Sequence, residues 1–435
     1  MTSQEVVGEE PKNSRRRAVS VYQWYVLALM FLMYMLCSAD KILIAIINEP
    51  LRHELHLSDS QLGLLSGTAY SVAFGLLVLP MGYLLDRFSR SKLVSATLAL
   101  WSLLTTVSAV MRSYGGLLVA RMGVGASETA AVPGGLSILA DVFPAVKRAT
   151  AVGIFYAAGG GGATVGFLVG GWVLRHYSWR AVFLFLGTPG LLLAALVALT
   201  VREPRRSSTA RMSKRAQISF SQSFLPTVRN SALRNAIIGN TLFLGTNLSF
   251  TLWLASFLTR VHGYAPHEAD TVAGATFGVG MTVGAACGGF IGDWFSHGDI
   301  VRLTRIAITC ITVACAAAIA FSLASNVLVV MLCIWITAIA AGSSQGNGVS
   351  VIVFLADPNT RGSTLAVTKL VEIMVGTGVI PLFTGAVSDA IGGPMSLRYA
   401  LVITACIFPV SAVFFFRAGA AARRLSRSIP VTSAS

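Results

Sequence analysis

An arginine and a glutamate stand seven residues apart in the apolar stretch Arg121-Met-Gly-Val-Gly-Ala-Ser-Glu128. In a helix this spacing is two turns, so both side chains lie on one face, about 10 Å apart along the axis. A charge at the centre of a membrane helix costs roughly 2.5–3.5 kcal/mol on insertion scales, so such charges have a partner or a function. Burial favours the neutral form of a carboxyl group and a nearby guanidinium favours the charged form. The pair therefore predicts a proton-handling site.

Asp40 is a third charge inside an apolar stretch. Counted at 1.5 Å per residue, Asp40 and Arg121 lie at similar depths, roughly 10 Å from the same membrane surface, and an ion pair between them is geometrically allowed. Glu128 lies near the midplane and is the predicted proton carrier, while Arg121 stays charged. We expect Asp40 and Glu128 to compete for Arg121 and for protons. The alternative is a static buried network that only fixes helix packing.

The composition indicates an integral membrane protein. Of the 435 residues, 54% are hydrophobic and 12% are charged, and soluble proteins carry about 25% charged residues. Apolar runs of about 20 residues, long enough to cross the bilayer as helices, predict an all-α fold of twelve transmembrane helices. The predicted spans are 22–47, 60–85, 93–112, 115–140, 149–174, 180–201, 233–260, 269–292, 302–324, 327–353, 362–390 and 396–418.

The positive charges predict the orientation. Most of the 33 Lys and Arg residues fall in the tails and in the loops on the side of the N-terminus, which places both termini in the cytoplasm. The net charge of +15 is therefore a topology signal rather than a nucleic-acid surface. We expect a multi-pass protein of the plasma membrane, or of the inner membrane of a bacterial cell.

An internal repeat predicts two halves. Gly82-x-x-x-Asp86 recurs as Gly289-x-x-x-Asp293, an offset of 293 − 86 = 207 residues. We expect an N-terminal tail at 1–21, a six-helix bundle at 22–201, a basic cytoplasmic linker at 202–232, a second bundle at 233–418 and a C-terminal tail at 419–435. Secondary transporters built from such repeats bind their substrate at the interface between the repeats, near the bilayer midplane.

The second half has no copy of the three charges, because the offset maps Asp40 onto Asn247, Arg121 onto Leu328 and Glu128 onto Trp335. Proton chemistry is therefore assigned to the first half, and neutral groups of the second half are the predicted substrate-cavity residues: Asn247, Trp335, Ser343, Gln345 and Asn347. These polar residues can equally bond neighbouring helices. Lys369 and Glu372 form a predicted self-neutralising i, i+3 pair, and a direct role in substrate binding is the alternative.

Nothing in the sequence indicates enzymatic or metal chemistry. The six cysteines lie scattered in apolar segments without C-x-x-C spacing, and the six histidines form no H-E-x-x-H motif. We expect no enzyme activity, no metal and no cofactor apart from protons as coupling ion. The expected partners are membrane lipids and a small amphipathic or anionic substrate, without nucleic acid, and the chain is expected to function as a monomer.

The loop Gly82-Tyr-Leu-Leu-Asp86-Arg87-Phe-Ser-Arg90-Ser-Lys92 resembles the cytoplasmic loop motif of the major facilitator superfamily. Ser89 replaces the usual glycine and Ser91 a usual basic residue, and the second copy keeps Asp293 with Trp294 as its neighbour. The resemblance implies that Asp86, Arg87, Arg90 and Asp293 form a cytoplasmic gate. Charge-assisted bonds there would exist in one conformation and break in another.

Within that superfamily the chain resembles the spinster family of lipid transporters over roughly residues 35–190. The resemblance is carried by Ser38-Ala-Asp-Lys41, Leu57-Ser-Asp-Ser-Gln-Leu-Gly-Leu-Leu65, Arg121 to Glu128, Asp141-Val-Phe-Pro144 and Trp179-Arg-Ala-Val-Phe183. Lys41 stands where the family has arginine, and Glu128 is shifted in the G-x-G-E pattern. The resemblance implies proton-linked, alternating-access movement of amphipathic lipids such as sphingosine 1-phosphate or lysophospholipids.

Several alternatives stay open. Organic-anion symporters are similar in carrying an arginine and a glutamate in the fourth span with a following proline, here Pro133. A multidrug antiporter is a further candidate within the transporters. In another class, the chain would be a receptor or a passive scramblase without a coupling ion. The sequence leaves open whether the chain imports or exports, and whether it is a symporter or an antiporter.

Overall fold

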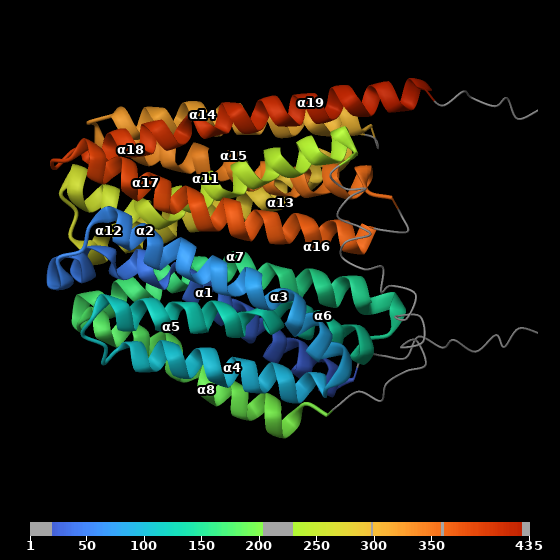
Figure 1. Ribbon diagram of the computed structural model, residues 1–435, viewed down its shortest axis with the longest axis horizontal. Helices are drawn as coiled ribbons and strands as arrows, with labels where there is room; N and C mark the ends of the chain where they lie inside the picture. The colour runs from blue at the N-terminus through green and yellow to red at the C-terminus, as the bar shows by residue number, and fades with distance from the viewer. Residues whose placement is uncertain (1–19, 203–228, 297–298, 358–360, 429–435) are drawn as a thin grey trace, which may run out of the picture.

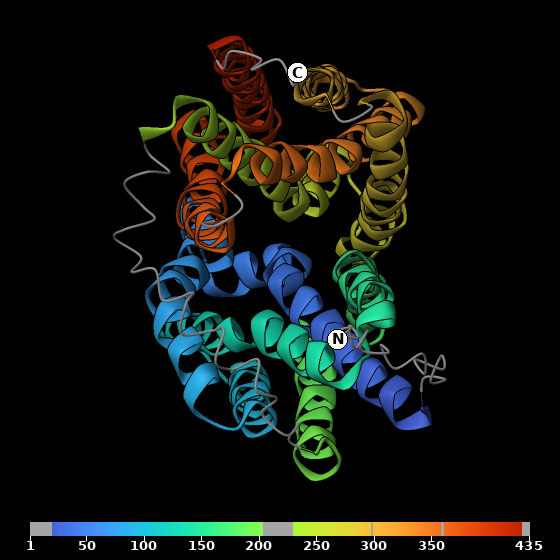
Figure 2. The same cartoon turned by 90° about the vertical axis from the view of Figure 1, so that its right-hand side faces the viewer.

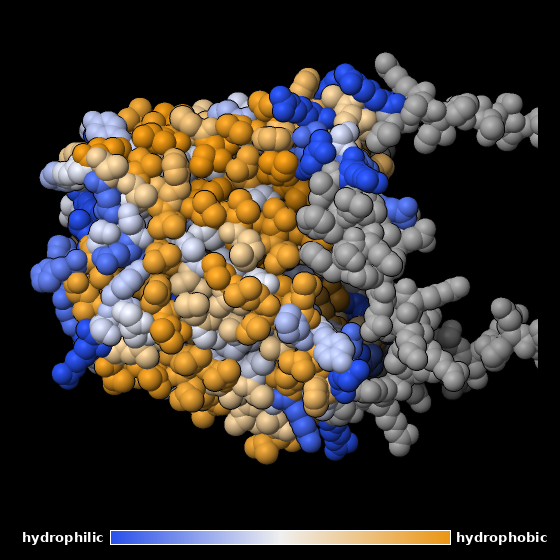
Figure 3. Space-filling model, in the orientation of Figure 1, coloured by the Kyte–Doolittle hydropathy of each residue, from blue (hydrophilic) through white to orange (hydrophobic). Residues whose placement is uncertain are grey.

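The computed structural model describes residues 20–202, 229–296, 299–357 and 361–428, and in these ranges the chain is helical without a strand. The predicted N-terminal tail and the linker lie largely outside these residues, whereas residues 419–428 of the predicted C-terminal tail are described and helical. Each of the twelve predicted spans falls mainly on helix, and the third, 93–112, runs four residues past the end of its helix at Ser108. Ten helices of the described ranges are long and apolar enough to cross a membrane, and an apolar surface band separates two polar ends (Figure 3).

The N-terminal helices lie together, in blue to green in Figure 1. They are α1 Val21–Leu55, α2 Asp59–Gly63, η1 Leu64–Thr68, α3 Ala69–Arg87, α4 Arg90–Ser108, α5 Tyr114–Ser127, η2 Glu128–Ala130, α6 Ala131–Val142, α7 Ala145–His176 and α8 Trp179–Thr200.

The C-terminal helices form the second group, from yellow-green to red in Figure 1. They are α11 Ser231–His262, α12 Pro266–Ala273, η3 Gly274–Gly278, α13 Val279–Ser296, α14 Ile300–Leu323, α15 Val327–Leu355, α16 Arg361–Val371, η4 Glu372–Thr377, α17 Gly378–Ile391, α18 Ser396–Ala405 and α19 Ile407–Ser428. The last helix continues beyond the predicted end of the twelfth span at residue 418.

Two of the twelve predicted spans are absent from the ten long apolar helices. The third predicted span corresponds to α4, which is rich in Ser and Thr, and three of its buried polar side chains, Ser95, Thr97 and Ser108, bond to carbonyls of the same helix. The fourth is divided into α5 and α6 by the 3-10 segment η2. The interruption falls at Glu128, so the fourth span is irregular where its predicted proton carrier lies.

The two halves touch closely at the end of the molecule away from Ser20 and Ser428, which we call the outer end after the predicted orientation. On one side, a Cβ on Gly63 of α2 would lie 2.8 Å from the carbonyl oxygen of Pro381 in α17, and a Cβ on Gly385 would collide with the carbonyl of Asp59. On the other side, a Cβ on Gly171 of α7 would lie 2.9 Å from the carbonyl oxygen of His267 in α12. Because glycine has no side chain, these residues allow the backbones of the two halves to touch at both edges of the interface.

Candidate functional site

Asp40 and Arg121 form a buried ion pair, which the helix rise allows. Arg121 Nη1 lies 2.8 Å from Asp40 Oδ2, and Nη2 donates to the backbone carbonyl of Asp40 at 3.2 Å. Thr105 of α4 donates to the other carboxylate oxygen at 2.8 Å. The two charged residues are 4% and 1% exposed. A buried ion pair is tolerated when its remaining polar atoms are bonded, and here most of them are.

Glu128 lies in the same predicted span as Arg121, at the start of η2, but is not bonded to it. Its Oε2 accepts hydrogen bonds from the Tyr70 hydroxyl at 2.6 Å and from the Cys37 thiol at 3.2 Å, while its buried Oε1 has no partner. In this conformation Arg121 is held by Asp40, and Glu128 is held by two neutral donors. The structure thus shows Arg121 paired with Asp40, and the competition between the two carboxyl groups stays a prediction.

Tyr70 of α3 connects the two parts of the site. Its ring centroid lies 6.0 Å from the Arg121 guanidinium carbon and 6.0 Å from Lys41 Nζ. The close approach depends on Gly125, since a Cβ there would collide with the Tyr70 carbonyl. Five helical segments, α1, α3, α4, α5 and η2, therefore converge on one cluster. We call it the charged cluster: Asp40, Lys41, Arg121, Glu128, Tyr70, Cys37 and Thr105.

Sequence reasoning found the charges of this cluster and missed its neutral members, Tyr70, Cys37 and Thr105. A weak signal exists for Cys37, which precedes Lys41 by one helical turn and so shares its face. Tyr70 and Thr105 carry no comparable signal in their own spans. Lys41, adjacent to Asp40, reaches the cluster from the Tyr70 side.

The five predicted substrate-cavity residues make no bond to the charged cluster within the described ranges. Ser343 and Asn347 of α15 bond to carbonyls of Gly284 and Gly288 in α13, at 2.9 and 3.4 Å. Asn247 contacts the Met281 sulfur at 3.5 Å. Trp335 is half-buried and Gln345 is exposed. Ser343, Asn347 and Asn247 therefore bond neighbouring helices, as the alternative interpretation allowed.

A second polar group of the C-terminal half surrounds Glu372. Glu372 is buried, and it accepts from Asn240 of α11 at 2.6 Å and from Lys369 at 3.0 Å. The Lys369 side chain is 66% exposed. The predicted i, i+3 pair is thus present. Asn240, which the sequence did not single out, donates the second hydrogen bond to the Glu372 carboxylate.

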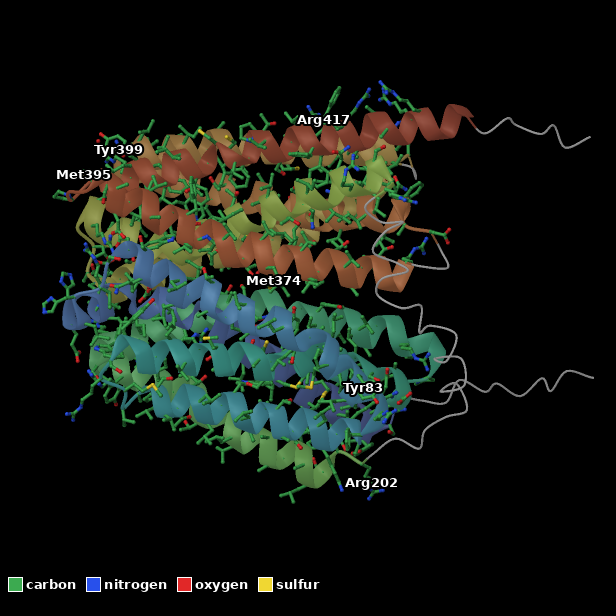
Figure 4. All side chains as sticks on the ribbon, in the orientation of Figure 1. Tyr83, Arg202, Met374, Met395, Tyr399 and Arg417 are labelled. Carbon is green, nitrogen blue, oxygen red and sulfur yellow. The ribbon has the colours of Figure 1, made fainter. Side chains whose placement is uncertain are left out.

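Among the predicted gate residues, Arg90 forms an ion pair with Asp141 of α6, and Arg87 lies over the Tyr83 ring at 4.5 Å. Figure 4 places Tyr83 at the end of the molecule that carries the termini. Asp86 also has interaction partners. The side chain of Asp293 lies outside the described part of the structure. Both of these contacts, Arg90 with Asp141 and Arg87 with Tyr83, stay within the N-terminal half.

A network that the sequence did not predict joins the halves at the outer end. Arg260 of α11 binds Glu49 of α1 at 2.7 Å and both carboxylate oxygens of Asp59 at 2.8 Å. Asp59 also accepts from Ser388 of α17 at 2.6 Å. Asp389 accepts from the backbone N–H groups of Asp59 and Ser60 at 2.9 and 2.7 Å. These bonds must break before the outer end can open.

Comparisons with known proteins place this geometry in a family. The profile of the Major Facilitator Superfamily matches residues 29–372. An MFS-type efflux pump of Mycolicibacterium smegmatis is 24% identical over 92% of this chain and 94% of its own length. The hexuronate transporter of Escherichia coli is 27% identical, but the match covers 57% of this chain and 60% of that protein.

Among solved structures, a bacterial homologue of the human lysosomal transporter Spinster, in an inward-facing and unoccupied conformation, has a TM-score of 0.82 at 24% identity. The match covers 94% of this chain and 99% of that one. The chain is therefore a member of the Major Facilitator Superfamily, with a fold of the spinster-like type.

Proposed function

We infer that the chain is a proton-coupled secondary transporter of anionic amphipathic molecules, of the sphingosine 1-phosphate or lysophospholipid type, working by alternating access. The observation that carries this proposal is the charged cluster in the N-terminal half. It unites a fixed cation, Arg121, with two buried carboxyl groups that differ in their partners.

The contacts of Glu128 support its role as the proton carrier. An ionised carboxylate buried in an apolar helix needs a countercharge. Arg121 is already bonded to Asp40, which leaves Lys41 as the neighbouring cation of Glu128. Tyr70 and Cys37 supply neutral hydrogen bonds to one oxygen and leave the other without a partner. Deprotonation would favour moving Arg121 from Asp40 towards Glu128. The exchange of partner would couple the protonation state to helix positions.

Two lysines support an anionic substrate. Lys369 belongs to the C-terminal half and is largely exposed, although it contacts Glu372. Lys41 belongs to the N-terminal half and is half-buried beside Tyr70. An ammonium group is a compact point charge that binds phosphate and carboxylate alike. The lysines therefore favour an anionic headgroup and leave its chemistry to experiment.

A second candidate is symport of a sugar acid or another small organic anion. It is favoured by the similarity to the hexuronate transporter of Escherichia coli. The same buried carboxyl groups would serve this reaction. The difference lies in the substrate, because a lysophospholipid has an acyl tail that must be accommodated and a sugar acid has none.

The test is transport by the full-length protein in proteoliposomes with an imposed pH gradient. The two probes are a fluorescent lysophospholipid and radiolabelled galacturonate. Glu128→Gln is compared with Asp299→Asn, because Asp299 is an exposed helix cap whose side chain accepts from Val301 N–H and Asn can replace it there.

We expect gradient-driven lysophospholipid movement in the wild type and in Asp299→Asn, and loss of the gradient dependence in Glu128→Gln. Gradient-driven galacturonate uptake would instead establish the second candidate. Flux that ignores the pH gradient in the wild type would indicate a scramblase, and absence of flux for both probes would favour a receptor. Either result would overturn proton-coupled transport of these substrates.

A further inference from the structure

Asp270 in α12 is a buried carboxyl group that the charged cluster does not include. It is 1% exposed, and neither of its carboxylate oxygens has a hydrogen-bond partner. No described residue forms an ion pair with it. Leaving an ionised carboxylate in such a place costs far more than leaving a neutral one, so an unpaired buried acid is expected to be neutral.

Asp270 lies at the interface between the two halves. Its Cβ is 3.2 Å from the position that a Cβ on Gly171 of α7 would occupy. One turn further along, Gly274 packs in the same way against Phe167, at 2.9 Å. The helices α7 and α12 lie side by side at this edge (Figure 2). Separation of the halves at the outer end would therefore uncover Asp270.

A pocket of about 510 Å³ lies on this edge and is lined by residues of both helices. Gly171, His267 and Thr271 line it and also surround the contact with Asp270. Arg175 and Glu268 line it as well. The pocket is large enough for water and carries polar groups, which suits a path by which a proton reaches the interface from the outer solution.

Apart from His262, the charged and titratable groups named here on the neighbouring elements are bound elsewhere or belong to the pocket. On α7 these are Arg175 in the pocket and His176, which bonds to the Trp172 carbonyl. On α11, Arg260 binds Glu49 of α1 and Asp59, and His262 Nε2 has no hydrogen-bond partner. On α12 itself, Glu268 caps Ala265 and His267 lines the pocket. None of them forms an ion pair with Asp270.

We propose that Asp270 is a second proton-binding site, located in the C-terminal half. Asp270 carries its proton while α7 and α12 are packed together and releases it to water when the two helices separate. Reprotonation must precede closure of the outer end, because an ionised carboxylate would oppose it. This site rests on the proposed proton coupling and adds a proton step at the outer end.

Infrared difference spectroscopy of the full-length protein in lipid vesicles tests the site without a substrate. The sample is shifted from acidic to alkaline pH, and the carbonyl band of protonated carboxyl groups is followed. Wild type, Asp270→Asn, Glu128→Gln and Asp299→Asn are compared. In wild type labelled with ¹³C-aspartate, bands of aspartic acids shift and those of glutamic acids do not.

We expect a protonated aspartic acid band that shifts with the label in wild type, is lost in Asp270→Asn and persists in Asp299→Asn. A pH indicator should record one proton fewer released per protein in Asp270→Asn, and Asp270→Glu should restore that proton. If Asp270→Asn does not fold, the labelled wild type still decides, because an unshifted band excludes a protonated aspartic acid.

A band that remains unchanged in Asp270→Asn would overturn this inference. It would leave the proposed function intact as long as Glu128→Gln removes a glutamic acid band and the dependence on the pH gradient. If Asp270→Asn keeps the aspartic acid band and Glu128→Gln keeps the glutamic acid band, both proposals are contradicted. The two failures are therefore distinguishable.

Discussion

Asp389 of the C-terminal half caps the first turn of α2, a helix of the N-terminal half. Its two carboxylate oxygens accept the backbone N–H groups of Asp59 and Ser60 at 2.9 and 2.7 Å. Backbone N–H groups at a helix start have no partner within the helix. The cap exists only while the halves are in contact, so it contributes to keeping the outer end closed.

Asp389→Ala should therefore weaken the closed state. Loss of a helix cap costs about 1 kcal/mol, and up to about 2 kcal/mol in proteins. A change of about 1.4 kcal/mol shifts the equilibrium between the closed and the open outer end roughly tenfold. The measurement is the labelling rate of Leu382→Cys in the outer interface, with an impermeant maleimide, in a background without the native cysteines. Unchanged labelling in Asp389→Ala would show that the cap does not limit opening.

Gly385→Ala should prevent full closure of the outer end. The added methyl would collide with the carbonyl oxygen of Asp59. This oxygen belongs to the main chain and cannot rotate away as a side chain can. We expect at least a tenfold loss of transport and faster labelling in the outer interface. Gly161→Ala in α7 is the control, because a Cβ there meets nothing within 4 Å and alanine favours the helix. Equal transport by both variants would contradict a tight outer contact.

Tyr70→Phe should alter proton coupling while the fold persists. The variant removes the hydroxyl that donates to Glu128 at 2.6 Å and keeps the ring beside Arg121 and Lys41. A hydrogen bond to a charged group contributes about 1.5–3 kcal/mol, so the pH of half-maximal transport should move. Tyr83→Phe is the control because Tyr83 is exposed and lies over Arg87 instead. A pH profile identical to wild type would exclude the hydroxyl from coupling.

Asp40→Asn should destabilise the protein because Arg121 would remain buried without its countercharge. Breaking a buried ion pair on one side costs about 3–5 kcal/mol, whereas removing both partners costs much less. The double variant Asp40→Asn with Arg121→Gln should therefore recover most of the thermal stability and remain inactive in transport. Thermal unfolding of the single and double variants measures this. A double variant as unstable as Asp40→Asn would indicate that the pair does not act as a unit.

The contacts of the charged cluster were predictable only in part. The rise per residue places Asp40 and Arg121 at similar distances from the same predicted membrane surface, so an ion pair between them was an allowed arrangement. The hydrogen-bond partner of Glu128 did not follow from the sequence. Tyr70 follows the π-helical turn η1 at Leu64–Thr68, and a π turn holds more residues than an α turn. The face that Tyr70 presents therefore depends on an irregularity that apolar periodicity does not reveal.

The contacts between the halves could not be predicted from the sequence, for a different reason. Glu49, Asp59, Arg260 and Asp389 lie near the ends of predicted spans, where charged residues are expected to be solvated. Only the packing of α2 against α17 brings Asp59 and Asp389 together. Asp270 lies at the start of the predicted span 269–292, where a carboxyl group is expected to be solvated.

The glycine contacts along both edges of the outer interface limit how a long-tailed molecule could leave. Gly63 against Pro381 closes one edge and Gly171 against α12 closes the other, each with backbone in direct contact. An acyl chain needs a gap at least as wide as a methylene group to slide sideways into the bilayer. At the Gly63 and Gly171 contacts no such gap exists in this conformation. A lipid tail held between the halves would therefore have to point away from the outer leaflet until both edges part.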